Sequence, residues 1–399
     1  MTSKWNRRQL LRGIVAVPAL AFADRAVGAA NVPVVSVAGA TDSETTAIIG
    51  HVSEFMQRYS VPGMSLAMTH AGQLKLLVCA GFANRESLEQ ITPRHRFRVA
   101  SVSKPITSMT VMKLASGGQV NLEQRVFGDD GVLGYGDDIA ALGDENGQRL
   151  KSITIRHLLE HTAGGWGNQT RDPMFTDDAL DLDHESLIRW TLANRPLEHP
   201  PGTHYAYSNF GYCLVGRIVA KAVGRPYESA VRSTILDPHG LHDATFQIGG
   251  NSLDDRQELE VVYYGQNSDP YGRRMNVRRM DAHGGWVASP TDLVRLVNRV
   301  DGFPGQPDLL SHDWIRTMTT PSTANPNYAK GWAVNSSNNW WHMGSFTGGS
   351  SIVARIHDDH CWAMTVNTRS QEPDYMQQVD ALPWKIRRCV TTWGSHDLF

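Results

Sequence analysis

The sequence predicts an α+β fold in two parts, with an antiparallel sheet built from both ends of the chain and a mainly helical part inserted between them. Short apolar runs bounded by turn residues, which are typical of strands, occur before residue 80 and again after residue 328. Between them, apolar residues recur at helical spacing in segments separated by Gly, Pro and Asp. Because a sheet must be buried against another layer, we expect the strands from both ends to join in one sheet.

The early part of the sequence predicts a β-hairpin followed by helices. Residues 62–68 and 74–79 are apolar runs, and the turn residues 70–73 lie between them. Helical spacing then predicts a helix over about residues 101–115. Further helices are predicted over residues 153–161, 184–193, 209–223 and 291–300.

The late part of the sequence predicts the rest of the sheet. Strand-like runs cover residues 328–334, 340–343, 351–356 and 361–366, and a terminal helix is predicted over about residues 374–392. The sheet part then comprises about residues 45–90 and 286–399, and the helical part about residues 91–285. A cleft between the two parts is the natural place for a functional site.

The N-terminus has the pattern of an export signal. Basic residues that include Arg7 and Arg8 precede the ten-residue apolar run 14–23, which is too short to cross a bilayer, and small residues suited to signal peptidase follow. Paired arginines are typical of the twin-arginine route, so we expect a periplasmic or secreted protein. The predicted signal peptide is residues 1–30, and the predicted single domain is residues 31–399. The alternative interpretation is a basic N-terminal helix.

Composition excludes several classes of protein. The chain has 38 Lys+Arg against 40 Asp+Glu, and its net charge of −2 argues against a nucleic-acid partner. We expect no membrane anchor, because no run of 18 apolar residues occurs and no cysteine lies near the predicted cleavage site. The four cysteines are far apart and form no metal-binding pair, so we interpret them as buried free thiols: Cys79, Cys213, Cys361 and Cys389.

The first candidate motif combines a hydroxyl and an amine at the start of a predicted helix. Ser101 and Lys104 are three residues apart, so they share one helix face and Lys104 could take the proton from Ser101 Oγ. The helix N-terminus would also favour a nucleophile through its dipole and free N–H groups. By itself the motif is weak, because an ordinary exposed helix start has the same residues.

The second motif is Tyr207-Ser208-Asn209, immediately before and at the start of a predicted helix. A phenol can pass a proton to a leaving group, and an amide can orient Lys104 or a substrate carbonyl. The alternative interpretation is a buried tyrosine in a loop, with Asn209 as the helix cap.

The third motif starts at His342 on a predicted late strand and continues through Met343, Gly344 and Ser345. Gly344 would let a substrate lie close to the strand edge. The Ser345 N–H could form an oxyanion hole with the N–H of Ser101.

The order of these three motifs resembles that of the penicillin-recognising serine hydrolases. That family includes class C β-lactamases, D-alanyl-D-alanine carboxypeptidases, D-aminopeptidases and family VIII carboxylesterases. Residues 97–100, 153–164 and 284–289 are also similar to family members, and the resemblance covers about residues 45–392. It implies a serine β-lactamase-like fold and a serine hydrolase activity.

The resemblance also implies roles for individual residues. Ser101 would be the acylated nucleophile, Lys104 its general base, and Tyr207 the group that passes a proton to the leaving group. Asn209 would position Lys104 and the substrate, and His342 would stand where many relatives carry lysine. Gly344 and Ser345 would border the substrate, as their place in the third motif suggests.

Two departures from the family pattern bear on the substrate. Family members commonly follow the lysine or histidine with a hydroxyl residue that helps to hold a substrate carboxylate, whereas this chain has Met343. His342 is also a less dependable cation than lysine at neutral pH. We therefore expect weak action on β-lactams and better action on small esters, D-amino-acid amides or D-peptides, with no cofactor or metal. An acyltransferase and a β-lactam sensor that does not turn over stay open as alternatives.

A zinc peptidase is the rival from another class. His157, Glu160 and His161 match the His-x-x-Glu-His pattern of inverted zinc peptidases. The residues that follow break the helix, and no later Glu stands out as a third ligand. The family resemblance explains the same stretch as a structural helix and turn, so we consider zinc catalysis unlikely.

Overall fold

The computed structural model of the chain describes residues 15–16, 34–170, 172–241 and 246–399. The predicted export signal over residues 1–30 lies outside the described residues, except for Val15–Ala16. No helix among the described residues has the length and apolar character needed to cross a membrane.

A nine-stranded sheet organises the molecule, in the order β1-β2-β4-β3-β13-β12-β11-β10, with β5 paired beside β4. The early strand β3 pairs antiparallel with the late strand β13 near the middle of the sheet, so both ends of the chain build it as predicted. The strands are β1 (Val15–Ala16), β2 (Val34–Ala38), β3 (Gly63–His70), β4 (Gln73–Asn84), β5 (Glu89–Gln90), β10 (Ala333–Val334), β11 (Trp340–Phe346), β12 (Gly349–Ile356) and β13 (His360–Val366).

The hairpin between β3 and β4 forms for a local reason. Ala71 and Gly72 are its two turn residues, and their φ angles are 50° and 75°. Positive φ at both central positions gives the turn whose twist matches that of the flanking strands. The predicted turn over residues 70–73 is therefore confirmed.

Two helices cover one face of the sheet: α1 (Asp42–Arg58) and α12 (Tyr375–Cys389). The first begins with a capping box, in which Thr41 and Glu44 satisfy each other's backbone N–H groups. Buried side chains of both helices, such as Phe55 and Ile386, join apolar side chains of the strands in one cluster. This burial of apolar surface fixes the two helices on the sheet.

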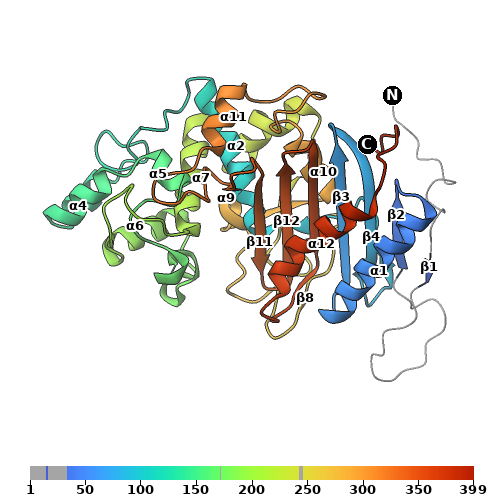
Figure 1. Cartoon of the computed structure of the whole chain (residues 1–399). Coiled ribbons are helices and arrows are strands. Elements are labelled where there is room, and N and C mark those ends of the chain that lie inside the picture. The colour runs from blue at the N-terminus through green and yellow to red at the C-terminus, as the bar shows by residue number, and fades with distance from the viewer. Residues whose placement is uncertain (1–14, 17–33, 171, 242–245) are drawn as a thin grey trace.

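The helical part and α10 lie toward the other face and one end of the sheet (Figure 1). Its apolar side chains form a second and larger cluster with residues of the sheet. The helices are α2 (Ser103–Ser116), α3 (Gly136–Ala140), α4 (Asp144–Lys151), α5 (Ile155–Leu159), α6 (His184–Asn194), α7 (Asn209–Val223), α8 (Tyr227–Val231), α9 (Asp281–Gly284), α10 (Pro290–Val297) and α11 (His312–Thr319).

Small elements complete the fold. A three-stranded sheet has the order β6-β9-β7, and β14 pairs in parallel with β8. Their bounds are β6 (Phe97–Arg98), β7 (Gln247–Ile248), β8 (Tyr264–Gly265), β9 (Trp286–Ala288) and β14 (Thr368–Arg369). Short 3-10 helices cover Ala100–Val102, Asn168–Thr170, Pro173–Phe175, Asp177–Ala179 and Asp237–His239, and a π-helical turn covers Arg232–Leu236.

Two predicted elements differ from the structure. Of the predicted strand 328–334, only Ala333–Val334 is a strand, because residues 328–331 turn toward α2, where Ser108 Oγ donates to the Lys330 carbonyl at 2.5 Å. The predicted helix 153–161 is helical only over Ile155–Leu159, and His161 has a φ of 58° that no right-handed helix contains.

The cysteines have no disulfide partners. All four are free thiols in the structure, and Cys79, Cys213 and Cys361 are buried. Cys389 is half-buried near the end of α12.

Candidate active site

Ser101 lies in a strained turn where the sheet meets the helical part. It belongs to the 3-10 helix Ala100–Val102, which leads directly into α2. Ala100 has a φ of 47°, in a region that residues other than glycine rarely occupy. Such strain is often found beside functional groups, because the surrounding structure must hold it in place.

Lys104 is the partner of Ser101. It is fully buried one helical turn later, and its Nζ lies 3.1 Å from Ser101 Oγ. Nζ also donates to Asn209 Oδ1 at 2.7 Å and to the backbone carbonyl of His283 at 3.0 Å. Burial lowers the pKa of Lys104 to about 7, and the Asp172 carboxylate opposes part of that change.

These contacts determine where the N–H groups and the lone pair of a neutral Lys104 amine point. Asn209 Oδ1 and the His283 carbonyl can only accept hydrogen bonds, so they take both N–H groups of a neutral amine. The remaining lone pair then faces Ser101 Oγ, which has a proton to give. The arrangement suits a lysine that removes a proton from a serine hydroxyl.

Tyr207 lies against the same pair of residues. The centre of its ring is 4.7 Å from Lys104 Nζ, and the centre of the His161 ring lies 4.3 Å from the centre of the Tyr207 ring. Burial raises the pKa of the Tyr207 phenol, and a hydrogen bond with the Ser101 side chain lowers it by less. The phenol therefore keeps its proton at neutral pH beside the serine oxygen.

Asn209 is held in place by a buried carboxylate. Its Nδ2 donates to Asp172 Oδ2 at 2.8 Å, and its backbone N–H donates to the same oxygen at 3.3 Å. The other oxygen of Asp172 accepts from the backbone N–H of Met174 at 3.0 Å. The helix cap is Ser208, whose hydroxyl accepts from the Gly211 N–H at 2.9 Å, so the side chain of Asn209 is not the cap.

His342 joins a chain of hydrogen bonds that runs through Tyr328 to His161. Tyr328 Oη lies 3.2 Å from Nε2 of each histidine. His161 Nδ1 accepts from the Ser208 N–H at 3.1 Å, so this ring carries its proton on Nε2. His342 Nδ1 lies 2.8 Å from the Met343 carbonyl, so it carries the proton there and Nε2 accepts from Tyr328.

Burial and the charge of Lys104 lower the pKa of His342 to about 3. The ring is therefore neutral over the physiological range of pH. Both of its nitrogens have protein partners, as the chain through Tyr328 shows. His342 thus carries no positive charge at the position where many relatives have a lysine.

Gly344 brings β11 against the backbone that precedes Ser101. A Cβ on Gly344 would lie 2.3 Å from the Val99 carbonyl oxygen and 3.1 Å from the Ala100 Cβ. The glycine is therefore required by this close approach of two backbones, whereas the sequence analysis attributes it to a substrate. The contact places β11 beside the turn that contains Ser101.

Met343 and Ser345 lie two residues apart on β11, so their side chains share one face of the strand. The last paired residues of β11 and β12 are Phe346 and Gly349, and a two-residue turn joins them. Backbone N–H groups alternate between the two edges of a strand, so the N–H of Ser345, which precedes Phe346, points away from β12. Met343 packs against the apolar cluster under α1 and α12, whereas His342 lies on the opposite face of the strand. Met343 therefore does not occupy the position of a substrate-binding hydroxyl.

His157 and His161 have separate partners. His157 Nδ1 accepts from the Thr154 N–H at 3.2 Å, and His161 is held by the chain through Tyr328. Glu160 forms a buried ion pair with Lys330, with 2.7 Å between Oε1 and Nζ. Within the described residues, no group of three or more His, Cys, Asp and Glu side chains is arranged to hold a metal ion.

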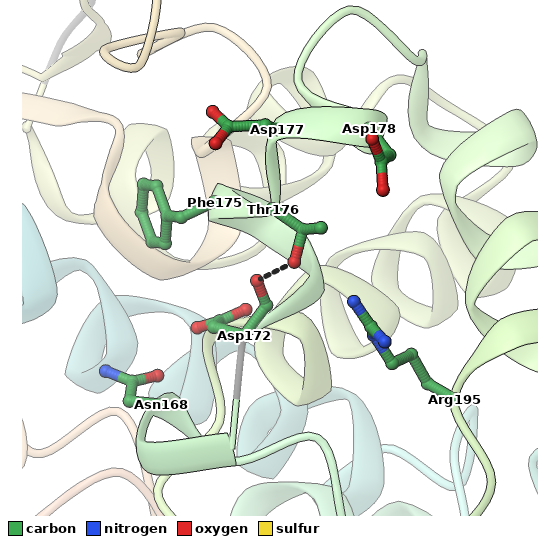
Figure 2. Close-up of a pocket in the computed structure, with 7 residues that line it drawn as sticks. All are labelled: Asn168, Asp172, Phe175, Thr176, Asp177, Asp178 and Arg195. Carbon is green, nitrogen blue, oxygen red and sulfur yellow. Dashed lines mark hydrogen bonds between the residues drawn. The ribbon is translucent and has the colours of Figure 1, made fainter.

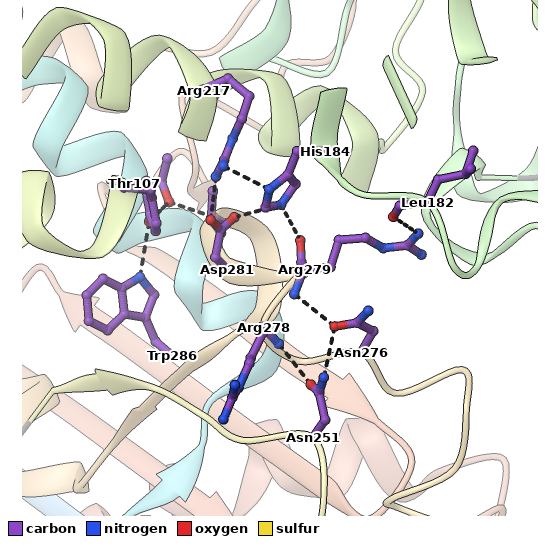
Figure 3. A network of polar contacts seen from close by, with 12 residues as sticks. Thr107, Leu182, His184, Arg217, Asn251, Asn276, Arg278, Arg279, Asp281 and Trp286 are labelled. Atoms are coloured by element: carbon purple, nitrogen blue, oxygen red, sulfur yellow. Dashed lines mark hydrogen bonds and ion pairs between the residues drawn. The ribbon is translucent and has the colours of Figure 1, made fainter. Parts of the chain in front are cut away.

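Figure 3 shows a polar network at the start of α9, the helix that supplies the His283 carbonyl to Lys104. The buried guanidinium of Arg279 donates to three carbonyls, those of Met174 at 2.7 Å, Ala179 at 2.5 Å and Leu182 at 2.9 Å. These contacts fasten the loop that contains Asp172 to the segment before α9. No motif in the sequence marked Arg279, Asp172 or Tyr328.

A cavity of about 570 Å³ opens beside Asp172 (Figure 2). It is lined by Asn168, Asp172, Phe175, Thr176, Asp177, Asp178 and Arg195. Ser101, Lys104 and Tyr207 are not among the lining residues.

Two curated relatives match part of the chain. The probable fimbrial assembly protein FimD, serogroup H1, of Dichelobacter nodosus is 28% identical over 204 residues, which are 51% of this chain and 48% of that protein. Penicillin-binding protein 4 of Amycolatopsis lactamdurans is 31% identical over 186 residues, which are 47% of this chain and 45% of that protein. The chain thus spans about half the length of the curated relatives it matches.

Solved structures with the same fold match most of the chain. The D-amino acid amidase of Ochrobactrum anthropi SV3, with L-phenylalanine amide, is 22% identical, covers 87% of this chain and 98% of its own, and has a TM-score of 0.68. SurE with D-Leu is 24% identical, covers 90% of this chain and 78% of its own, and has a TM-score of 0.63. These likenesses confirm the predicted β-lactamase-like fold.

The match to a family model covers more of the chain than the matches to these curated relatives do. The model described as Beta-lactamase matches residues 48–382, which include every residue of the three motifs. The predicted resemblance is confirmed at the level of the family. The chain belongs to the Beta-lactamase family.

Proposed function

We propose that the protein is a serine hydrolase that acts on an ester or an amide through an acyl-enzyme at Ser101. The observation that carries this proposal is the environment of Lys104 Nζ. Two acceptors, Asn209 Oδ1 and the His283 carbonyl, fix its N–H groups, and its third partner is Ser101 Oγ. Since burial lowers the pKa of Lys104 to about 7, much of it is neutral near neutral pH.

The proposed acylation begins when the Lys104 amine takes the proton of Ser101 Oγ. The oxygen attacks the substrate carbonyl carbon, and the N–H groups of Ser101 and Ser345 hold the negative oxygen that develops. The bond to the leaving group breaks as Tyr207 gives it a proton, and the proton on Lys104 restores the phenol. Water then attacks the acyl carbonyl, releases the acid and restores Ser101.

We propose small esters, D-amino-acid amides or D-peptides as substrates. The shared fold with a D-amino acid amidase and with SurE bound to D-Leu supports the D-amino-acid compounds. β-Lactams carry a carboxylate, and His342 offers it no positive charge because its pKa is about 3 and both ring nitrogens have partners. The same neutrality supports weak action on β-lactams.

A panel of substrates tests the proposed activity. Wild type and Ser101→Ala are assayed on p-nitrophenyl esters, D-amino-acid amides, D-Ala-D-Ala peptides and nitrocefin. Ser116→Ala is the matched control, because Ser116 is exposed at the far end of α2. Turnover of an ester or amide in wild type and Ser116→Ala, and its loss in Ser101→Ala, is the expected result. Acyl transfer without free acid would indicate an acyltransferase, and a single unreleased acylation would indicate a sensor.

A further inference from the structure

Two charged side chains that have no ion-pair partner among the described residues border the cavity beside Asp172. Arg195 follows the end of α6, and its buried Nε has no hydrogen-bond partner. Within the described part of the chain, its guanidinium forms no ion pair and lies 5.1 Å from the centre of the Trp190 ring. Figure 2 shows the guanidinium directed into the cavity. The end of the guanidinium is thus a cation directed at a space that a ligand can enter.

Asp178 borders the same space with the opposite charge. Figure 2 shows Asp178 and Arg195 on different walls of the cavity. Asp178 has neither an ion pair nor a side-chain hydrogen bond with any described residue, whereas its neighbour Asp177 pairs with Arg274 at 2.5 Å. The two unpaired charges do not neutralise each other, because no ion pair joins them.

Two features make the cavity suited to a small polar ligand. Its volume of about 570 Å³ lies within the range of ordinary ligand sites, which is about 300–1,000 Å³. A guanidinium binds a carboxylate through two parallel hydrogen bonds, and a carboxylate binds an ammonium group. A single ligand that carries a carboxylate and an ammonium group would pair with Arg195 on one wall and with Asp178 on the other.

We propose that this cavity binds a zwitterion of amino-acid or short-peptide size, with its carboxylate on Arg195 and its ammonium group on Asp178. The site adjoins the catalytic residues without including them. Asp172 lines the cavity and also holds Asn209, which contacts Lys104. The proposal concerns binding alone and does not depend on the proposed hydrolase activity.

Calorimetric titration with simple probes tests the site. The zwitterions are glycine, γ-aminobutyrate and glycylglycine, which differ in the separation of their charges. Propionate and propylamine each carry one of the two charges. Each titration is repeated with Ser101 blocked by a fluorophosphonate, so that binding at the nucleophile is excluded. The variants are Arg195→Gln and Asp178→Asn, and the matched controls are Arg189→Gln and Asp181→Asn, whose charges lie outside the cavity.

We expect at least one zwitterion to bind roughly ten-fold or more tightly than either single-charge probe, in free and blocked protein alike. Arg195→Gln and Asp178→Asn should each remove that preference, and the two controls should keep it. Three results would overturn the proposal: no measurable binding, equal binding of zwitterions and single-charge probes, or an unchanged preference in Arg195→Gln. An inactive enzyme that still shows the preference would contradict the proposed function and leave this site standing.

Discussion

At the scale of single residues, the proposed chemistry depends on the protonation of Lys104. The amine must be neutral to take a proton from Ser101, and burial lowers its pKa to about 7. Acidification below pH 7 charges the amine, so the rate should fall with pH. The pKa of His342 is already about 3, so its protonation adds nothing between pH 5 and 9.

The first prediction is therefore a one-sided pH profile. We expect kcat/KM for a p-nitrophenyl ester to be flat above about pH 8 and about 100-fold lower at pH 5, because only about 1% of a base with a pKa of 7 is neutral there. The measurement is kcat/KM from pH 5 to 9. A rate that stays constant or rises toward pH 5 would show that Lys104 is not the base.

Asp172 provides an internal check on that profile. Its carboxylate raises the pKa of Lys104, so Asp172→Asn should move the midpoint of the profile to lower pH as well as reduce the rate. Asp181→Asn removes an exposed carboxylate from the same region and should leave the midpoint unchanged. A midpoint that moves upward in Asp172→Asn would contradict the assignment.

The sequence predicted the residues around Ser101 better than the residues that hold them in place. Ser101, Lys104, Tyr207 and Asn209 lie in short motifs, and the structure brings their side chains together. Asp172 was missed because its partner Asn209 is 37 residues away, and nothing local marks it. Contacts of that kind depend on how the whole chain folds, so a local pattern cannot reveal them.

At the scale of elements, the alternation of β11 decides the role of Met343. Its side chain packs under α1 and α12, on the face opposite His342. Met343→Thr should therefore leave nitrocefin turnover within a few-fold of wild type and lower the free energy of unfolding by about 1 kcal/mol through lost packing. Nitrocefin assays and urea unfolding measure both effects. A ten-fold or greater gain in nitrocefin kcat/KM would place Met343 at the substrate after all.

The loop that contains Asp172 depends on Arg279 for its position. Arg279→Met removes hydrogen bonds to three carbonyls that then lie buried without that donor. We expect a loss of about 2–4 kcal/mol in the free energy of unfolding, and a fall in kcat as the loop loosens around Asp172. Arg273→Met breaks only an exposed ion pair and should leave the free energy of unfolding close to that of wild type. Equal stability of the two variants would show that the network is not needed.

Elements with strong local signals were predicted well. The predicted helix 209–223 matches α7, because apolar spacing is regular and Gly224, with a φ of 71°, ends the helix. The strand prediction for residues 328–331 was wrong. These residues form a turn that is held by a hydrogen bond from α2 and by the Glu160–Lys330 ion pair. Tertiary contacts override local preference in that segment.

At the scale of the whole molecule, both chain ends build the sheet, and Ser101 lies where β11 meets the helical part. The sequence predicted this architecture because strand and helix patterns are segregated along the chain. It could not predict the cavity beside Asp172, whose described walls come from residues 168, 172 and 175–178 and from Arg195 at the end of a different helix.

Export is also a property of the whole molecule, and we propose that Arg7 and Arg8 direct it by the twin-arginine route. Changing both to Lys should leave uncleaved precursor in the cytoplasm of the native host, because that route requires the arginine pair. Fractionation and blotting of wild type and variant measure it. Normal export of the double variant would contradict this route.

The central claim is that Ser101 is acylated with the help of Lys104, and a fluorophosphonate probe tests it most directly. Wild type is labelled, digested and mapped by mass spectrometry beside Ser101→Ala, Lys104→Met and the exposed control Ser116→Ala. We expect one adduct, on the peptide that contains Ser101. It should be absent in Ser101→Ala, much slower to form in Lys104→Met and unchanged in Ser116→Ala. An adduct on another serine, or equal labelling of Ser101 in Lys104→Met, would contradict it.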